Sequence, residues 1–287
     1  GSDLMIIDHI HHKRPDLHTQ LMRSPDPGAA KARSYLGGRG LGGDVPKRWM
    51  LGYAPGRSQM TTHLLSLGFK PDELVLANVA VNKNGHLNDR FYERAMFPIH
   101  DVTGECIAFG GRILGEGEPK YLNSQETPIF HKSQVLFGLD KAKAKMASTG
   151  CAIVCEGYTD VIAMHEAGIT NAVATLGTAL TKAHIRVLSR HAGKRIVYIF
   201  DGDAAGQRAT ERALQFIDDT STPEAGRSQT EIFALCLPDG QDPAEYLAAH
   251  GADEMQALID DARPLVQFGL ERRLANHDLT SAEGRAR

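Results

Sequence analysis

Residues 194–212, KRIVYIFDGDAAGQRATER, join the pattern of a buried strand to that of a helix through two aspartates. The run 196–200 has the length and the β-branched and aromatic content of a buried strand. It stops at Asp201-Gly202-Asp203, and the pattern that follows predicts a helix over 204–218. This stretch therefore predicts a strand, a turn and a helix, with two carboxylates at the carboxyl end of the strand.

A second stretch, CAIVCEGYTD at 151–160, repeats this plan. Its short apolar run ends in Glu156-Gly157, and a helical pattern follows. In an open parallel sheet the carboxyl ends of the strands meet at one edge, where ligands bind. Carboxylate oxygens suit Mg²⁺, and glycines beside them let the backbone come close. We therefore expect Glu156, Asp201 and Asp203 to form a metal-dependent phosphoryl-transfer site that acts on nucleic acid.

The second half of the chain continues this alternation of strands and helices. Short connections between alternating strands and helices are typical of a parallel α/β layer. In order, the predicted elements are strand 152–155, helix 158–167, strand 171–175, helix 181–192, strand 196–200, helix 204–218, strand 231–237, helix 244–250 and further helix over 253–277.

The first half has a mixed pattern. Residues 95–99 and 106–114 predict a pair of strands joined by a turn, and Gly110-Gly111 form a weak point in the second of them. Residues 51–56 read as a turn, 82–85 as a loose turn after a helix, and 119–124 as irregular. The predicted helices are 29–36, 44–50, 61–68 and a lysine-rich one at 138–146.

The composition is that of an ordinary globular protein, with 42% hydrophobic and 23% charged residues. No apolar run approaches the length that spans a membrane, and no signal segment opens the chain. The four cysteines are scattered, as expected for buried reduced thiols in a cytosolic protein. Cys151 and Cys155 lack a second pair at zinc-finger spacing. We therefore expect a cytoplasmic protein without membrane association and without zinc in this chain.

Charge is divided unevenly along the chain. Residues 1–150 contain 19 Lys and Arg against 15 Asp and Glu, whereas residues 151–287 contain 13 against 20, so that the halves carry +4 and −7. A metal site beside a polyanion track needs this division, although a chance imbalance of solvated faces would also produce it. Arg and Lys side chains bind phosphate, and each of them could equally be a surface charge. The candidates in the first half are Arg90, Arg94, Arg112, Lys120 and Lys132.

Three of the acids have a second interpretation. Asp203 could cap the helix that follows it. Asp160 lies one helical turn after Glu156 and could face the same cation, or it could be an early-helix acid that the helix dipole favours. Asp242 begins the helix start Asp242-Pro243-Ala244-Glu245, so it could serve as a cap, a metal ligand or both.

Several motifs together resemble a known family. EGYTD (156–160), LGTAL (176–180), YIFDGDAAGQRA (198–209) and LPDGQDPAEYL (237–247) closely resemble the TOPRIM fold of bacterial replicative primases of the DnaG type. RFYERAMFPIHD (90–101), IAFGGRIL (107–114) and PKYLNSQETPIFHKS (119–133) are similar to the basic amino-terminal subdomain of the same family. The resemblance extends from about residue 30 to the end of the chain.

The resemblance implies an α/β protein in three parts. These are a basic α+β subdomain over 1–146, a TOPRIM subdomain with a Rossmann-like parallel sheet over 147–240, and the start of a helical subdomain over 241–287. It implies synthesis of short RNA primers on single-stranded DNA from ribonucleoside triphosphates. By motif position, Glu156, Asp201 and Asp203 would be catalytic, and Asp160 and Asp242 would join them in holding Mg²⁺ or Mn²⁺, with two ions expected. The five basic candidates would hold template or nucleotide.

One departure from the family pattern affects the metal site. The family commonly has a second acid two residues after the position of Asp242, where this chain has Ala244, so we expect a weaker outer metal site. No zinc ribbon precedes residue 30, and we expect an isolated, monomeric catalytic core whose helicase partner binds a region beyond residue 287. A TOPRIM nuclease and a non-catalytic nucleic-acid-binding module remain as alternatives.

Overall fold

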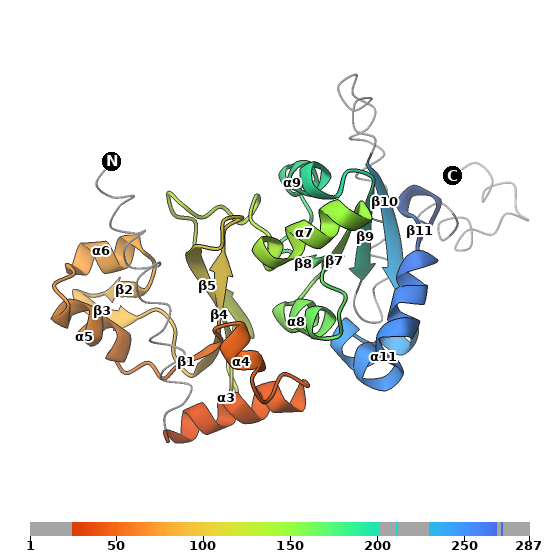
Figure 1. Ribbon diagram of the computed structural model, residues 1–287. Coiled ribbons are helices and arrows are strands. Elements are labelled where there is room, and N and C mark those ends of the chain that lie inside the picture. Colours follow the sequence, from red (N-terminus) through yellow and green to blue (C-terminus); the bar gives the residue numbers. More distant parts are fainter. Residues whose placement is uncertain (1–24, 201–210, 212–229, 269–270, 272–287) are drawn as a thin grey trace, which may run out of the picture. The chain divides into compact units, whose positions relative to one another are not determined.

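The computed structural model describes residues 25–200, 211, 230–268 and 271 of the chain. The described residues belong to two compact units, Gly1–Asp140 with Thr175–Thr181, and Lys141–Ala174 with Lys182–Arg287. The first unit mixes helices with antiparallel strands, and the second is an α/β unit (Figure 1). The expected functional division at residues 146 and 240 stays a prediction.

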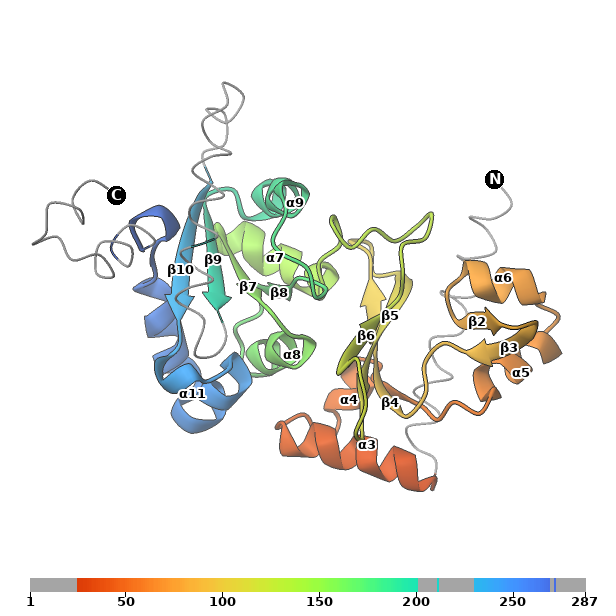
Figure 2. The ribbon, with the colours of Figure 1, turned by 180° about the vertical axis from the view of Figure 1, so that it is seen from behind.

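A four-stranded antiparallel sheet forms the centre of the first unit, in the order β1-β4-β5-β6 (Figure 2). The strands are β1 (Gly52–Ala54), β4 (Arg94–His100), β5 (Cys106–Ile113) and β6 (Tyr121–Asn123). Every residue of β4 is buried. Asp101 makes the turn after β4, because its Oδ1 accepts hydrogen bonds from the backbone N–H groups of Thr103 and Glu105. The predicted strand pair and its turn are confirmed.

The other elements that the structure describes in the first unit are α3 (Pro27–Gly38), α4 (Val45–Arg48), α5 (Gln59–Ser66), α6 (Pro71–Leu76), β2 (Ala80–Lys83) and β3 (His86–Asp89). Apolar side chains from α5, α6, β4 and β5 share one core. The buried carboxylate of Asp89 accepts hydrogen bonds from the N–H of Thr61 at 2.9 Å and from its hydroxyl at 2.7 Å. Asp89 thereby caps α5 from across the fold, since Ser58 at the N-cap position makes no side-chain hydrogen bond.

Two predictions in the first unit are wrong because each missed a short strand. A third, the turn over 82–85, is confirmed, but the strands on either side of it were missed. Residues 52–54 form β1 rather than part of a turn, and 121–123 form β6 rather than irregular chain. Both strands depend on pairing with distant residues, which leaves no local period to read. The loose turn over 82–85 is the tip of the β2–β3 hairpin. Asn84 and Gly85 both have positive φ, at 53° and 81°, and an Asn-Gly pair of this kind is a strong hairpin signal.

The second unit has a five-stranded sheet in the order β11-β10-β9-β7-β8. Strands β8, β7, β9 and β10 are parallel, and the two-residue β11 pairs antiparallel with β10. The predicted parallel α/β layer is confirmed. Its described elements include α7 (Leu139–Thr149), β7 (Cys151–Cys155), α8 (Tyr158–Glu166), β8 (Ala172–Ala174), α9 (Lys182–Ala192), β9 (Arg195–Phe200), β10 (Glu231–Cys236), α11 (Pro243–Asp260) and β11 (Arg263–Pro264).

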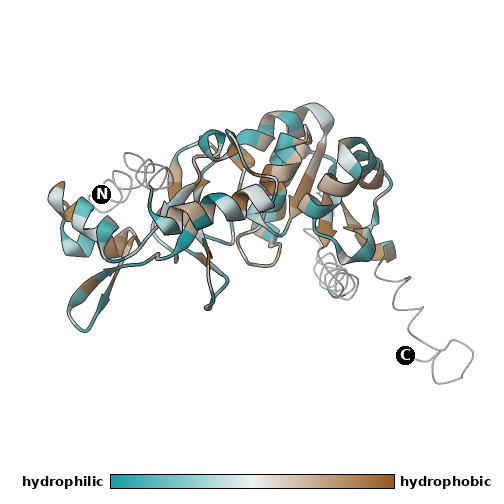
Figure 3. Ribbon diagram, turned by 90° about the horizontal axis from the view of Figure 1, so that it is seen from below, coloured by the Kyte–Doolittle hydropathy of each residue, from teal (hydrophilic) through white to brown (hydrophobic). Residues whose placement is uncertain are grey.

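Helices cover this sheet, so its central strands are apolar along their length. Helix α9 packs on β7 and β9, and α8 packs against α11. Ile153, Val154, Ile196, Val197 and Ile199 are fully buried, as expected for parallel strands covered on both faces. Figure 3 shows the corresponding brown segments in the strands, with hydrophilic and hydrophobic residues alternating along the helices.

The carboxyl-terminal elements differ from the prediction in one respect. The break between the two predicted helices is confirmed, because Gly251 has φ 83° inside α11. The predicted second helix is interrupted after Asp260, where the chain turns back to pair β11 with β10. Residues 265–268 and 271 are helical again, and the rest of the predicted span to residue 277 lies outside the described residues. The predicted helix over 204–218 lies outside the described residues, apart from Glu211. Within the described ranges, no helix is both long and apolar enough to cross a membrane.

Candidate functional site

The carboxyl edge of the parallel sheet carries the first predicted site residue. The register pairs each β7 residue with the β9 residue 44 positions later, as in Cys151 with Arg195 and Val154 with Tyr198. Continued by two residues, this register sets Glu156 level with Phe200, the last residue of β9. Because neighbouring strands lie about 5 Å apart, we expect Glu156 to lie one strand spacing from Phe200, the residue that precedes Asp201 in the chain.

The strand order creates a switch point at this position. The chain passes from β7 to β8 on one side of the sheet and from β9 to β10 on the other. In doubly wound sheets the crevice at such a point, outside the carboxyl ends of the two strands, is where ligands bind. Glu156 follows one of these strands and Asp201 the other. Asp201 and Asp203 themselves lie outside the described residues.

Asp160 is held close to the start of α8. Its side chain is only 3% exposed, although it carries a carboxylate. It lies in the first turn of α8, where the helix dipole favours negative charge. An ideal Cβ on Gly157 would lie 2.6 Å from Asp160 Oδ2, a distance that no real side chain tolerates. The glycine after Glu156 therefore leaves room for the Asp160 carboxylate in its present position, while its own backbone has an ordinary extended conformation.

Replacing Gly157 by alanine should displace the Asp160 carboxylate. The new methyl group cannot remain at 2.6 Å from Oδ2, so either the aspartate rotates or the turn shifts. If Asp160 serves the metal site, we expect ribonucleotide incorporation to fall about tenfold or more, with a loss of stability of roughly 1–3 kcal/mol from the overpacking. Incorporation on a single-stranded template and thermal unfolding measure the two effects.

Gly38→Ala is the control for this substitution. Gly38 lies in α3, and a Cβ there would meet no atom within 4 Å. We expect this variant to keep its activity and to be slightly more stable, because alanine is the better helix former. Full activity in Gly157→Ala would show that the position of the Asp160 carboxylate does not matter for the reaction.

Asp242 is the N-cap residue of α11. Its Oδ1 accepts a hydrogen bond from the N–H of Glu245 at 2.8 Å, and Glu245 Oε2 accepts one from the N–H of Asp242 at 3.2 Å. This capping box was predicted and is confirmed. Whether Asp242 also serves a metal stays a prediction. Ala244, at the position where the resembling family commonly has an acid, is a buried residue, 8% exposed.

The donor set at this edge fits divalent cations of the Mg²⁺ type. Glu156 and Asp160 supply carboxylate oxygens, the ligands that Mg²⁺ prefers in proteins. Among the described residues, no group of three or more His, Cys, Asp and Glu side chains is arranged to hold a metal. That the aspartates after β9 complete such a set stays a prediction, because they lie outside the described residues.

In the first unit, Arg94 interacts electrostatically with two of the other predicted arginines, Arg90 and Arg112. Burial lowers the pKa of Arg90, and the charge of Arg94 lowers it further. Burial likewise lowers the pKa of Arg94; Tyr92 raises it, and Arg112 lowers it further. The guanidinium of Arg112 lies over the ring of Tyr35, 4.8 Å from its centroid. Mutually repelling cations favour a polyanion as neighbour.

Arg94 differs from the others because it is buried, with 1% of its surface exposed. Its Nη1 donates to the carbonyl of Gly111 at 3.0 Å and its Nη2 to that of Pro119 at 3.0 Å. A longer hydrogen bond of 3.5 Å reaches the carbonyl of Lys120. A Cβ on Gly111 would lie 2.9 Å from Arg94 Cδ, which explains a glycine in the middle of β5. These contacts tie β4 to β5 and to the chain before β6.

Lys120 and Lys132 lie on either side of β6 in the sequence. Lys120 is exposed, directly after the proline that Arg94 binds. Lys132 is half-buried, and its backbone N–H donates to Glu126 Oε1 at 3.0 Å. Glu126 Oε2 also lies 2.8 Å from His131 Nδ1. The Lys132 hydrogen bond and, to a smaller extent, the His131 contact lower the pKa of Glu126. Glu126 therefore fixes the loop that presents Lys132.

Asn123 is a residue that the sequence did not single out. Its Nδ2 donates to the carbonyl of Leu176 at 2.9 Å, and its own carbonyl accepts a hydrogen bond from Arg90 Nη2 at 3.3 Å. Through these contacts residues 175–181, which follow β8, belong to the first unit. The sequence offers one indication of this contact, Gly177 in LGTAL. Gly177 has φ 69°, and an ideal Cβ built on it would lie 3.5 Å from Asn123 Nδ2.

Comparison with known proteins assigns both halves of the chain. The family described as "DNA primase catalytic core, N-terminal domain" matches residues 18–143, and the "Toprim-like" family matches residues 153–247. The DNA primase of Streptomyces coelicolor is 40% identical over 267 residues, which are 91% of this chain and 40% of that protein. The chain thus spans about two-fifths of the length of this relative.

Solved structures match nearly the whole chain. The RNA polymerase domain of Mycobacterium tuberculosis primase DnaG has a TM-score of 0.86 and 33% identity, over 97% of this chain and 90% of that one. A DnaG primase catalytic domain bound to single-stranded DNA has a TM-score of 0.81 and 35% identity, over 99% and 90% of the two chains. With the primase motifs, the mixed first unit and the TOPRIM-like sheet all in agreement, the chain belongs to the family of DnaG-type DNA primase catalytic cores.

Proposed function

We propose that this chain synthesises short RNA primers on single-stranded DNA by nucleotidyl transfer. The observation that carries the proposal is the switch point between β7 and β9, with Glu156 level with the end of β9. The family supports the same function, and a relative has been solved with single-stranded DNA bound. Because the chain spans two-fifths of its curated relative, primer synthesis is proposed for this part and not carried over from the whole protein.

The acids at this edge would hold the metal. We propose Glu156, Asp201 and Asp203 as the catalytic set, with Asp160 and Asp242 completing the ligands for two Mg²⁺ or Mn²⁺ ions. Divalent ions held there would lower the pKa of a ribonucleotide 3′-hydroxyl and neutralise charge that develops on the triphosphate. The chain itself would position these carboxylates, Asp160 through its burial above Gly157 and Asp242 through its capping box.

The basic residues of the first unit would hold the polyanions. We propose that Arg90, Arg112, Lys120 and Lys132 contact the template backbone or the triphosphate. Arg94 would act differently, since its donors already bind backbone carbonyls. We propose that it fixes the chain around Pro119 and Lys120, and so directs Lys120 toward its ligand. A guanidinium held this way shapes a phosphate site without entering it.

A primer-synthesis assay tests the proposed function. Incubation with single-stranded DNA, labelled ribonucleotides and Mg²⁺ should yield short, alkali-labile products that chelation abolishes. With four phosphate contacts, template binding should be about 50-fold weaker at 200 mM than at 50 mM salt. A titration of a fluorescent oligonucleotide measures this dependence.

The assay also separates the two alternatives. A TOPRIM nuclease would shorten labelled DNA in Mn²⁺ without nucleotides, with water as the attacking group in place of a hydroxyl. A non-catalytic binding module, which Ala244 favours at the outer metal site, would bind DNA without forming product or cleaving it. Product formation without template cleavage supports primase activity, and either other pattern contradicts it.

We further propose the cellular setting that the family implies. The chain would act as a monomer in the cytoplasm, with ribonucleoside triphosphates as substrates and a replicative helicase as the partner of the longer protein. Sedimentation of the chain with and without a single-stranded oligonucleotide tests the monomer, because a dimer would appear at twice the mass of 31.2 kDa.

A further inference from the structure

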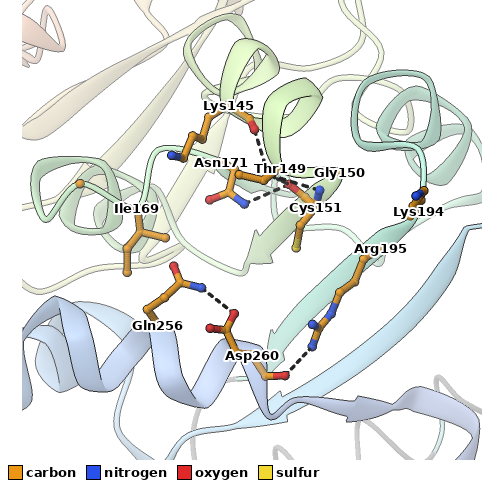
Figure 4. Close-up of a pocket in the computed structure, with 11 residues that line it drawn as sticks. Lys145, Thr149, Gly150, Cys151, Ile169, Asn171, Lys194, Arg195, Gln256 and Asp260 are labelled. Atoms are coloured by element: carbon orange, nitrogen blue, oxygen red, sulfur yellow. Dashed lines mark hydrogen bonds between the residues drawn. The ribbon is translucent and has the colours of Figure 1, made fainter.

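The second unit has a hollow at the amino ends of β7 and β9, the end of the sheet opposite Glu156. It has a volume of about 490 Å³, which is within the range of small-molecule sites. Cys151 begins β7 and Arg195 begins β9, and both line the hollow. Figure 4 shows them with Asn171, Gln256 and Asp260 around the same space. A ligand here would lie away from the proposed metal site.

Basic side chains dominate the charge of this hollow. Lys145, Lys194 and Arg195 line it together with one acid, Asp260. Within the described part of the chain, no carboxylate pairs with the ammonium group of Lys145 or of Lys194. Lys194 and Arg195 belong to residues 151–287, which carry a net charge of −7, whereas Lys145 belongs to the preceding half of the chain. The two lysines therefore favour an anion with concentrated charge, such as a phosphate group.

Arg195 is held by several contacts, and its positive charge mainly compensates the negative carboxyl end of helix α11. Its Nη2 donates to the carbonyls of Ile259 at 2.9 Å and Asp260 at 3.2 Å, at the carboxyl end of α11. Its guanidinium also lies over the ring of Phe233, 4.3 Å from the centroid. A cation at this position compensates the negative end of the helix dipole. The surplus positive charge that a ligand would meet is therefore that of the two lysines.

Two residues of the pocket lining offer hydrogen-bond acceptors. Asn171 is 7% exposed, and its Nδ2 donates to the carbonyl of Cys151 at 2.9 Å. Its Oδ1 makes no hydrogen bond with any described residue, and Figure 4 shows this oxygen turned away from that contact. The carboxylate of Asp260 accepts one hydrogen bond, from Gln256 Nε2 at 2.9 Å. Acceptors of this kind suit hydroxyl groups of a ligand.

We propose that this pocket binds a ribose-phosphate group, carried by a free nucleotide or a sugar phosphate. The phosphate would contact Lys145, which lies beside Asn171 in Figure 4, and ribose hydroxyls would donate to Asn171 Oδ1 and Asp260. The inference concerns a second site, and it does not rest on the proposed primase activity. Binding requires none of the carboxylates at the other edge of the sheet.

Cys151 provides a direct readout of ligand binding. Its thiol is half-buried in the pocket; burial raises its pKa, Arg195 lowers it and Asp260 raises it. Alkylation by iodoacetamide at mildly alkaline pH, followed by mass spectrometry, reports its accessibility. Ribose 5-phosphate or AMP, added with chelator at constant ionic strength, should slow alkylation of Cys151 about fivefold. Cys236, also half-buried but outside the pocket lining, should react at an unchanged rate.

Two matched substitutions test the lysine contact. Lys145→Gln should raise the concentration of ribose 5-phosphate needed for half protection about tenfold. Lys141→Gln, one turn earlier on α7 and outside the pocket lining, should leave it unchanged. Both lysines are exposed, so neither substitution threatens the fold. Glu156→Gln should also leave protection unchanged, which separates this site from the proposed metal site.

The outcomes divide clearly. Protection by ribose 5-phosphate equal to that by AMP supports a sugar-phosphate ligand, and stronger protection by AMP supports a nucleotide. Equal protection by inorganic phosphate would overturn the ribose contacts, leaving an adventitious ion only. Absence of protection by all three probes, or protection that Lys145→Gln does not weaken, would overturn the site.

Discussion

Ribonucleotide incorporation should fall by about two to three orders of magnitude when Glu156 is replaced by glutamine. The substitution keeps the size of the side chain and removes one negative charge at the switch point between β7 and β9. Such a loss corresponds to a metal ligand that stabilises the transition state by about 3–4 kcal/mol. Since Glu156 is half-buried, its replacement by the isosteric amide should change the melting temperature little. Single-turnover incorporation at saturating template measures the effect on chemistry.

Glu166→Gln is the matched control. Glu166 ends α8 and is exposed, whereas Glu156 lies just before that helix begins. Both substitutions change the net charge equally, so a general electrostatic effect would appear in both. Template affinity should remain that of the unmodified chain in each variant, because DNA binding is assigned to the basic residues of the first unit. Wild-type incorporation by Glu156→Gln would remove this residue from the catalytic set.

The sequence predicted the two strands that lead to Glu156 and Asp201 because the relevant signals are local. Apolar runs at 152–155 and 196–200 mark strands, and each is followed at once by a carboxylate and a glycine. The carboxyl ends of parallel strands lie at one edge of the sheet, so recognising the two strands is enough to predict that the residues after them share this edge. The structure adds the reason for Gly157, whose missing side chain makes room for Asp160. That distance depends on a rotamer, which no pattern of residue types records.

The first unit was harder to predict because its contacts are long-range. Strands β1 and β6 have three residues each and exist through pairing with β4 and β5. Asp89 caps a helix that begins 30 residues earlier in the chain. In the sequence, Arg90, Arg94 and Arg112 look alike, as basic residues near glycines. Only the fold separates a buried arginine from its half-buried neighbours.

Replacing Arg94 by methionine should destabilise the protein by about 3 kcal/mol. The guanidinium is buried and binds the carbonyls of Gly111 and Pro119 at 3.0 Å each. Methionine fills the space of the stem but leaves these carbonyls without their donors, a loss typical of buried charged hydrogen bonds. Thermal or urea unfolding measures it, with a decrease in melting temperature of roughly 10 °C. Arg94→Lys should recover only part of the loss, because one ammonium cannot reproduce the planar fork.

Lys120→Met provides the comparison that separates two roles of a basic residue, direct binding of phosphate and structural support of the chain. Lys120 is exposed and lies next to Pro119, so its replacement should leave the melting temperature unchanged while weakening template binding several-fold. Arg94→Met should show the reverse order, with a large loss of stability and a loss of binding that follows from displacement of the chain around Lys120. If Arg94→Met had the melting temperature of the unmodified protein and yet lost template binding, the Arg94 guanidinium would be a direct phosphate ligand. Arg94 would then have to leave its carbonyl partners when DNA binds.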